Sequence, residues 1–436
     1  MKKLLPLFIS AAIGSLSSSA FADTLAEVYD QAKQNDPQLL RSAAQRDAAF
    51  EAVTSSRSDL LPQINLTAGY NINRSDIDAR ESDKLTAGIN FSQELYQRSS
   101  WITLDTAEKS ARQADSAYAA EQQALILRVA TAYFEVLRAQ DNLEFVRAEK
   151  AAVARQLEQT KQRFEVGLSA ITDVHDAQAQ YDGVLADEVL AENTLTNNYE
   201  GLREITGQEH SNLSILDTDR FSASKSSDSA VALVQQAEKN NLSLLAARIS
   251  QDVAKDNISL ASSGHLPSLT LDGGYNYGDE SNSNNGSQGD YNDFNVGVNL
   301  VVPLYTGGNT TSLTRQAEYN YVAASEDLEA TYRSVVKDVR AFNNNISASI
   351  GALRAYEQSV VSAQSALEAT EAGFDVGTRT IVDVLDSTRR LYDANKNLSD
   401  ARYNYILSVL QLRQAVGTLS EQDIVDVNAG LKVASK

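Results

Sequence analysis

Four segments of the chain alternate apolar and polar residues with a period of two, the pattern of β-strands with two different faces. The predicted strands cover residues 62–73, 84–96, 266–277 and 293–305. Each is about as long as a tilted transmembrane strand, and an apolar face opposite a small, polar face suits a strand between lipid and a water-filled lumen. A strand of a soluble sandwich also alternates, but four such segments in two matching pairs favour transmembrane strands.

Most of the remaining chain predicts helices, two of them very long. Residues 98–165 and 308–375 contain no proline and little glycine, so each predicts one helix of ~100 Å at 1.5 Å per residue. From Leu125 to Phe164, apolar or small residues recur with 4-3 spacing, interrupted at Lys150. This spacing predicts coiled-coil packing; a helix of a bundle shares the stripe, but not this length. Shorter helices are predicted at 25–60, 170–205, 229–264 and 380–416.

The two halves of the chain repeat one plan. Residues 61–71 return at 266–276, both beginning Leu-Pro and ending Gly-Tyr-Asn, and residues 164–174 return at 374–384. Two copies indicate duplication rather than a solenoid. We expect the two short helices of each half to stack end to end beside its long helix. The predicted units are a first repeat over 23–206, a linker over 207–228, a second repeat over 229–418 and a tail over 419–436.

The N-terminus and the composition indicate an exported protein. Lys2 and Lys3 precede an apolar run, and Ala20-Phe21-Ala22 is a small-x-small cleavage site, so residues 1–22 are predicted to be a signal peptide. No later stretch approaches the ~18 apolar residues of a transmembrane helix. The net charge of −20 argues against nucleic acid as a partner, because few cations are available to neutralise phosphates.

Four transmembrane strands per chain predict an oligomer. A sheet in lipid cannot leave open edges, because its unpaired backbone groups would find no water. Bacterial barrels have at least about eight strands, so a dimer or a trimer would close one. A trimer would have twelve strands and room for a pore. The physics of the residues does not choose between these two.

The candidate functional residues lie where the long helices turn back. Gly167 and Gly377 follow them, and glycine adopts the left-handed conformation that ends a helix. Acids with i, i+3 spacing come next: Asp173 and Asp176 in the first half, and a second such pair in the other half, at 383 and 386. Such spacing places both carboxylates on one helix face. Acids at any helix N-terminus are also favoured by the helix dipole, which is the simpler interpretation.

An enzyme is not expected. The three histidines, His175, His210 and His265, stand apart without metal-ligand spacing. The chain has no cysteine, and no nucleophile motif or glycine-rich phosphate loop is present. We therefore expect no catalytic residue, no metal and no cofactor.

Several longer motifs resemble the outer membrane efflux protein family over essentially the whole chain. They are Ala-Leu-Ile-Leu at 124–127, Arg-Phe at 163–164 with Val-Gly at 166–167, Ala-Ile-Thr-Asp-Val at 170–174, Arg-Ser-Val-Val at 333–336 and the run 376–386. The resemblance implies an α+β fold: a periplasmic coiled-coil helical barrel joined to a transmembrane β-barrel that trimerisation completes with four strands per chain. It also implies an equatorial belt formed by 207–228 and the C-terminal tail.

The resemblance further implies partners and site residues. A homotrimer would lie in outer-membrane lipid and dock with a periplasmic adaptor and an inner-membrane pump of the RND, ABC or MFS type, exporting drugs, detergents such as bile salts, or proteins. The implied constriction is Asp383 with Asp386. The implied closed-state lock joins Arg379 to Thr172 and Asp173 of a neighbouring helix pair, and Gln156 to Glu371. Family members can carry a tyrosine at the position of Phe374, and its hydroxyl bonds to the acid that matches Asp173. Phe374 has no hydroxyl, so the resemblance implies that this bond is absent here.

Two alternatives stay open at this point. The first is an outer-membrane channel dedicated to metal cations. The second, of a different class, is a soluble periplasmic coiled-coil adaptor, which would explain the export signal and the heptads but not the four strands.

Overall fold

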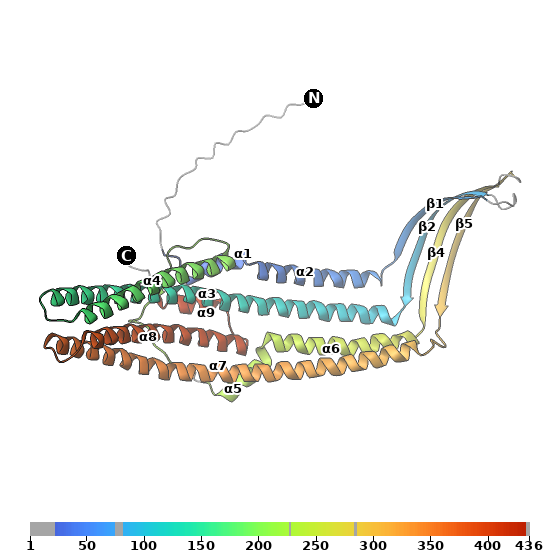
Figure 1. Ribbon diagram of the computed structural model, residues 1–436. Helices are drawn as coiled ribbons and strands as arrows, with labels where there is room; N and C mark the ends of the chain where they lie inside the picture. The colour runs from blue at the N-terminus through green and yellow to red at the C-terminus, as the bar shows by residue number, and fades with distance from the viewer. Residues whose placement is uncertain (1–21, 75–81, 226–227, 283–285, 433–436) are drawn as a thin grey trace, which may run out of the picture.

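The computed structural model describes residues 22–74, 82–225, 228–282 and 286–432. The predicted signal peptide therefore lies outside the described residues, except for Ala22. The molecule is a long helical stem with a curved sheet at one end (Figure 1). Its elements are α1 (Leu25–Asn35), α2 (Pro37–Ser58), β1 (Gln63–Asn73), β2 (Ser82–Tyr96), α3 (Arg98–Glu165), α4 (Ile171–Thr206), β3 (Ile215–Leu216), α5 (Ala230–Asn240), α6 (Leu242–Ser262), a 3-10 turn (Ser263–His265), β4 (Ser268–Asn282), β5 (Gly286–Val301), α7 (Asn309–Asp375), α8 (Ile381–Val416), α9 (Glu421–Asn428) and β6 (Leu431–Lys432).

The structure divides each of the helices expected over 25–60 and 229–264 into two. Asp36 lies between α1 and α2 in an extended conformation and accepts a hydrogen bond from the Leu39 N–H. Asn241 does the same between α5 and α6, accepting from the Leu244 N–H. A side-chain oxygen at this position caps the following helix. At Asp36, the next residue is Pro37, which also disfavours the helical conformation of the residue before it.

The four long strands form one antiparallel sheet in the order β1-β2-β4-β5. The register aligns one apolar row across the sheet, listed in order as Leu66, Ile89, Tyr275 and Phe294. The neighbouring row on the other face is Thr67, Gly88, Asn276 and Asp293. The sheet therefore has the apolar and polar faces that the alternation predicts. In this chain β1 and β5 are its two edges.

Three strand boundaries lie several residues from the expectation. β4 continues to Asn282 and β5 begins at Gly286, so most of the polar stretch between the predicted strands 266–277 and 293–305 is paired as strand. Backbone pairing between strands needs no apolar side chains, so the two strands continue past the point where the apolar–polar alternation stops. β5 stops at Val301 rather than at 305, because Pro303 has no N–H to continue a ladder.

The stem has the end-to-end arrangement expected from the helix lengths. α2 and α4 follow one another along α3, while α6 and α8 follow one another along α7 and also contact α3 (Figure 1). The heptad stripe of α3 is largely buried, including Leu125, Val136 and Val153. Phe164, at its end, is 41% exposed. None of the described helices is long and apolar enough to cross a membrane.

The linker and the C-terminal tail pack together at the middle of the stem. The linker strand β3 pairs with the tail strand β6, and Asp23 bridges to Leu213 in the same linker. The largest described core lies beneath them, where Tyr133 and Phe134 of α3 are completely buried. The chain thus has its strongest packing at mid-stem, roughly halfway between the sheet and the helical tip.

Candidate functional site at the helical tip

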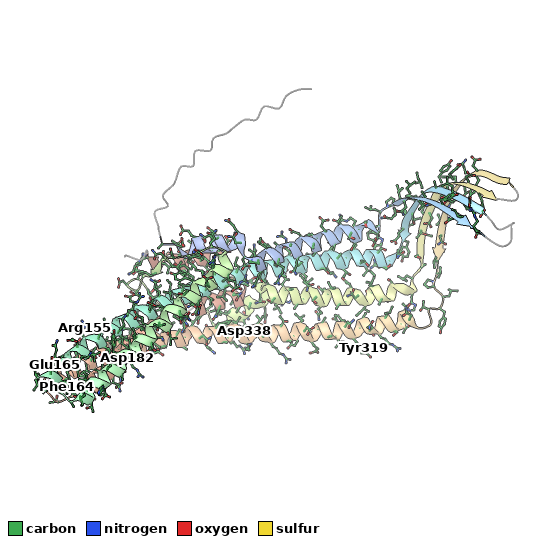
Figure 2. All side chains as sticks on the ribbon, turned by 45° about the horizontal axis from the view of Figure 1, so that its top comes forward. Arg155, Phe164, Glu165, Asp182, Tyr319 and Asp338 are labelled. Carbon is green, nitrogen blue, oxygen red and sulfur yellow. The ribbon has the colours of Figure 1, made fainter. Side chains whose placement is uncertain are left out.

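Both long helices end at the tip in glycine turns. Gly167 has φ +76° and Gly377 has φ +79°. The Leu168 N–H reaches back to the Arg163 carbonyl oxygen at 2.8 Å, and the Thr378 N–H to that of Gly373 at 2.8 Å. A left-handed residue with such backward bonds ends a helix and pairs its last carbonyls. The two turns bring α4 and α8 back along α3 and α7 (Figure 2, where Phe164 and Glu165 mark the tip).

Asp383 caps the start of α8. Its Oδ2 accepts from the Thr380 N–H and from the Thr380 hydroxyl, both at 2.9 Å. The Thr380 backbone N–H, then its hydroxyl, and also the nearby Arg379 charge hold the pKa of Asp383 below its usual range. Asp173 caps α4 in the same way, accepting from the Ala170 N–H at 3.1 Å and the Ser169 hydroxyl at 2.7 Å. Asp383 is therefore ionised at neutral pH.

Asp386 lies one turn further along α8 and is exposed. Its Oδ2 is 2.6 Å from Nη2 of Arg390, an ion pair with i, i+4 spacing. On the opposite side of this helix, Ile381 and Leu385 are buried. The two acids thus lie on a face of α8 that points away from the packed core at the tip.

That core joins the two helical hairpins α3–α4 and α7–α8. It contains Val153 and Leu157 of α3, Ala177 and Val184 of α4, and Ile381, Val384 and Leu385 of α8. Beside this core, the buried Gln156 of α3 donates from Nε2 to Oγ1 of Thr388 of α8 at 3.0 Å. Glu371, the partner expected by resemblance, is exposed on α7, and no hydrogen bond between it and Gln156 occurs in the described part of this single chain.

The other expected lock residues are not joined within one chain. Thr172 and Arg379 are exposed, and among the described residues no hydrogen bond or ion pair connects Arg379 with Thr172 or Asp173. The Arg379 side chain instead lies against Gly373, where an added Cβ would be 2.7 Å from Arg379 Cγ. Phe374 is half-buried beside the tip core. The lock that links neighbouring helix pairs stays a prediction.

Sequence reasoning missed two arginines of the tip. Arg390 pairs with the candidate constriction residue Asp386, and Arg163 contacts Phe374 across the two hairpins. The i, i+4 spacing of Asp386 and Arg390 was a readable signal, but no local spacing indicates a contact between α3 and α7. No group of three or more metal-binding side chains occurs within the described ranges.

Comparisons with known proteins cover essentially the whole chain. A family model described as outer membrane efflux protein matches residues 28–208 and 233–418. The chain belongs to the outer membrane efflux protein family. It is 82% identical to outer membrane protein TolC of Vibrio cholerae, covering 100% of both chains. It is 29% identical to the alkaline protease secretion protein AprF of Pseudomonas aeruginosa, covering 97% of this chain and 90% of that protein.

The fold agrees with solved structures of such channels. The crystal structure of the Campylobacter jejuni CmeC outer membrane channel superposes with a TM-score of 0.78 at 16% identity, covering 99% of this chain and 98% of that chain. The protein is therefore an outer-membrane efflux or secretion channel, with a helical tunnel in the periplasm and a β-barrel domain in the membrane. A soluble periplasmic adaptor, the alternative of another class, does not fit this assignment.

Proposed function

We propose that the protein is the outer-membrane exit duct of tripartite efflux pumps and of type I protein secretion, and that it acts as a homotrimer. The observation that carries this proposal is the sheet with two open edges, β1 and β5, at the end of the helical stem. In lipid those edges must pair, so β5 of one subunit would join β1 of the next. Three copies would close twelve strands around a pore.

The stem supports the same assembly. Its two lateral helical surfaces expose large apolar side chains: α7 exposes Tyr319 and Val361, and α2 and α4 expose Phe50 and Leu190. Tyr319 lies on the side of α7 away from the other helices (Figure 2). Such exposed apolar side chains along both surfaces suit contact with a neighbouring subunit, which would bury them. Three stems joined through these surfaces would form a tunnel of twelve helical columns.

The tip would form the gate of this tunnel. Threefold symmetry would turn Asp383 and Asp386 into rings of three carboxylates, and carboxylate rings build cation-selective constrictions. Asp383 suits this role because its caps keep it ionised. The closed state would be restrained by Arg379 of one helix pair with Thr172 and Asp173 of the next. Gln156, which bonds to Thr388 within the subunit and has Glu371 as its alternative partner, would add to this restraint, and all would part in an iris-like opening.

The cargo and the partners follow from the family. A periplasmic adaptor and an inner-membrane pump of the RND, ABC or MFS type would complete the duct. The relative AprF is named for secretion of an alkaline protease, which favours protein cargo beside drugs and bile-salt detergents. Metal cations are the alternative cargo, and sensitivity tests of a deletion strain against bile salts, drugs and metal salts separate the two.

Planar-bilayer conductance tests the gate. We expect the double variant Asp383→Ala/Asp386→Ala to lose the cation preference of the wild-type channel. Asp176→Ala is the matched control, because this acid occupies the equivalent helix turn of the other hairpin and is exposed. The control should keep the wild-type selectivity. Unchanged selectivity in the double variant would move the constriction elsewhere, and a protein that forms no channel at all would end the proposal.

A further inference from the structure

Arg163 connects the two hairpins at the tip. It lies in the last turn of α3, and its guanidinium carbon is 4.5 Å from the centre of the Phe374 ring in the last turn of α7. The same guanidinium is 3.8 Å from Oδ1 of Asp375. The side chain of Arg163 is 25% exposed although it carries a full charge. One cation thus contacts a ring and a carboxylate that follow each other on the opposite hairpin.

The chemistry of the three side chains favours this arrangement. A guanidinium is planar and weakly hydrated, so it stacks on an aromatic face and still pairs with a carboxylate at its edge. The Phe374 ring packs beside the apolar core of the tip, so its position is fixed by that core. Asp375 is more exposed, at 66%, and an exposed pair contributes little by itself. The stacking contact is therefore the larger part of the interaction.

We propose that Arg163 is a positioning residue of the gate, clamping α3 to α7 within each subunit and so holding the tip closed. This inference rests on the proposed function, because it assumes that the hairpins separate when the channel opens. Arg163 differs from the expected lock residues, which join different helix pairs through Arg379. Here the phenyl ring of Phe374 serves as the contact surface, and no hydroxyl is needed.

The clamp lies where separation must begin. It joins the ends of α3 and α7 directly beside their glycine turns, at the tip end of the apolar core. Any outward rotation of one hairpin against the other lengthens this contact first. A cation–π contact of this exposure changes an equilibrium by about fivefold. Three clamps that open together would change the ratio of open to closed channels by about a hundredfold.

The experiment measures single-channel conductance and resting ion leak of the purified full-length trimer in planar bilayers. We expect Arg163→Ala to raise the fraction of open channels strongly and Phe374→Leu to do the same, because leucine keeps an apolar side chain but lacks the ring. Arg163→Lys should be intermediate, since it keeps the charge without the plane. Asp375→Asn should have the smallest effect. A double variant of Arg163→Ala with Phe374→Leu should open no further than either single variant.

Arg155→Ala is the matched control. This arginine lies two turns earlier on α3, is exposed (Figure 2), and makes no hydrogen bond or ion pair with any described residue. It should conduct like the wild type. Thermal dissociation of the trimer is measured beside conductance, because a residue with only a structural role would lower that midpoint in step with the leak.

The outcomes separate the clamp from the channel itself. Wild-type leak in both Arg163→Ala and Phe374→Leu overturns the clamp but leaves the channel and its aspartate constriction standing. Equal leak from Arg155→Ala and Arg163→Ala also overturns it, since loss of any cation would then suffice. If Arg163→Ala does not assemble, Arg163→Lys and Phe374→Leu decide the question. A wild-type protein that forms no channel refutes the proposed function instead.

Discussion

The hydrogen bond between Gln156 and Thr388 predicts two substitutions with unequal effects. Both side chains are buried, with Gln156 9% and Thr388 1% exposed. Gln156 Nε2 donates to Thr388 Oγ1 at 3.0 Å, and that hydroxyl donates onward to the Val384 carbonyl oxygen at 2.9 Å. The Gln156 Oε1 atom is buried and has no partner among the described residues. The pair crosses from α3 to α8 and therefore connects the two hairpins.

Removing Thr388 and removing Gln156 leave different numbers of buried polar groups without a partner. Thr388→Val fills the same space but leaves both ends of the Gln156 amide buried and unpaired, which costs about 1–3 kcal/mol. Gln156→Leu removes the unpaired oxygen together with the donor, while Thr388 keeps its bond to Val384. The lost hydrogen bond, worth about 1 kcal/mol, is then offset by the removal of a buried unpaired group. We therefore expect Gln156→Leu to be within about 1 kcal/mol of the wild type.

Conductance and thermal unfolding of the trimer measure the difference. Thr388→Val should raise the resting conductance and lower the unfolding midpoint, and Gln156→Leu should do much less of either. Ser387→Ala is the control, because Ser387 donates to Thr370 Oγ1 at 3.2 Å within the same hairpin. Its loss should leave the closed state intact. The larger effect of Thr388→Val is expected only if Thr388 is the main partner of Gln156.

The reverse ordering would refute the reasoning. If Gln156→Leu opens the channel more than Thr388→Val, the contact within the subunit is not the restraint. Gln156 would then act through another acceptor, and Glu371 is the partner that the family resemblance implies. Glu371→Gln should reproduce the Gln156→Leu effect in that case.

Three further predictions concern charge. Thr380→Ala removes one of the two donors that lower the Asp383 pKa, so cation preference should be lost at a higher pH than in the wild type when conductance is titrated downward. Arg390→Gln removes the cation beside Asp386 and should increase cation preference, measured as reversal potential at low salt. Burial raises the Asp141 pKa, so folded wild type gains stability as pH falls through that pKa. An Asp141→Asn variant lacks this gain, and calorimetry should show their stability difference changing between pH 7 and about 4.

Much of the fold was readable from local patterns. The period of two gave strand faces that the register of Leu66 with Ile89 reproduces, because side-chain alternation and backbone pairing are properties of the same extended chain. The long helices could be predicted because neither proline nor clustered glycine interrupts their sequences. The break at Asp36 was also readable, as Asp followed by Pro37, whereas the matching break at Asn241 has no proline to announce it.

The contacts of the tip were not readable in this way. Gln156 and Thr388 are 232 positions apart in the chain, and many acceptors on α8 are compatible with the same helical pattern. Arg163 has an aromatic partner because two separate glycine turns end α3 and α7 at the same level. Such pairs depend on the relative height of two hairpins, which no local spacing records. Contacts between subunits are still harder to predict from local patterns, because they involve a second chain.

Packing is uneven along the stem, and this supports the proposed gate at the tip. At mid-stem, α3 is buried by α1, α4, α8 and α9 around Tyr133 and Phe134. At the tip, a smaller apolar core and a few polar contacts join the hairpins. Regions with fewer buried apolar contacts open at lower free energy. Under the proposed gating, the hairpins would therefore separate first at the tip, where weak restraints such as Arg163 would hold the closed state.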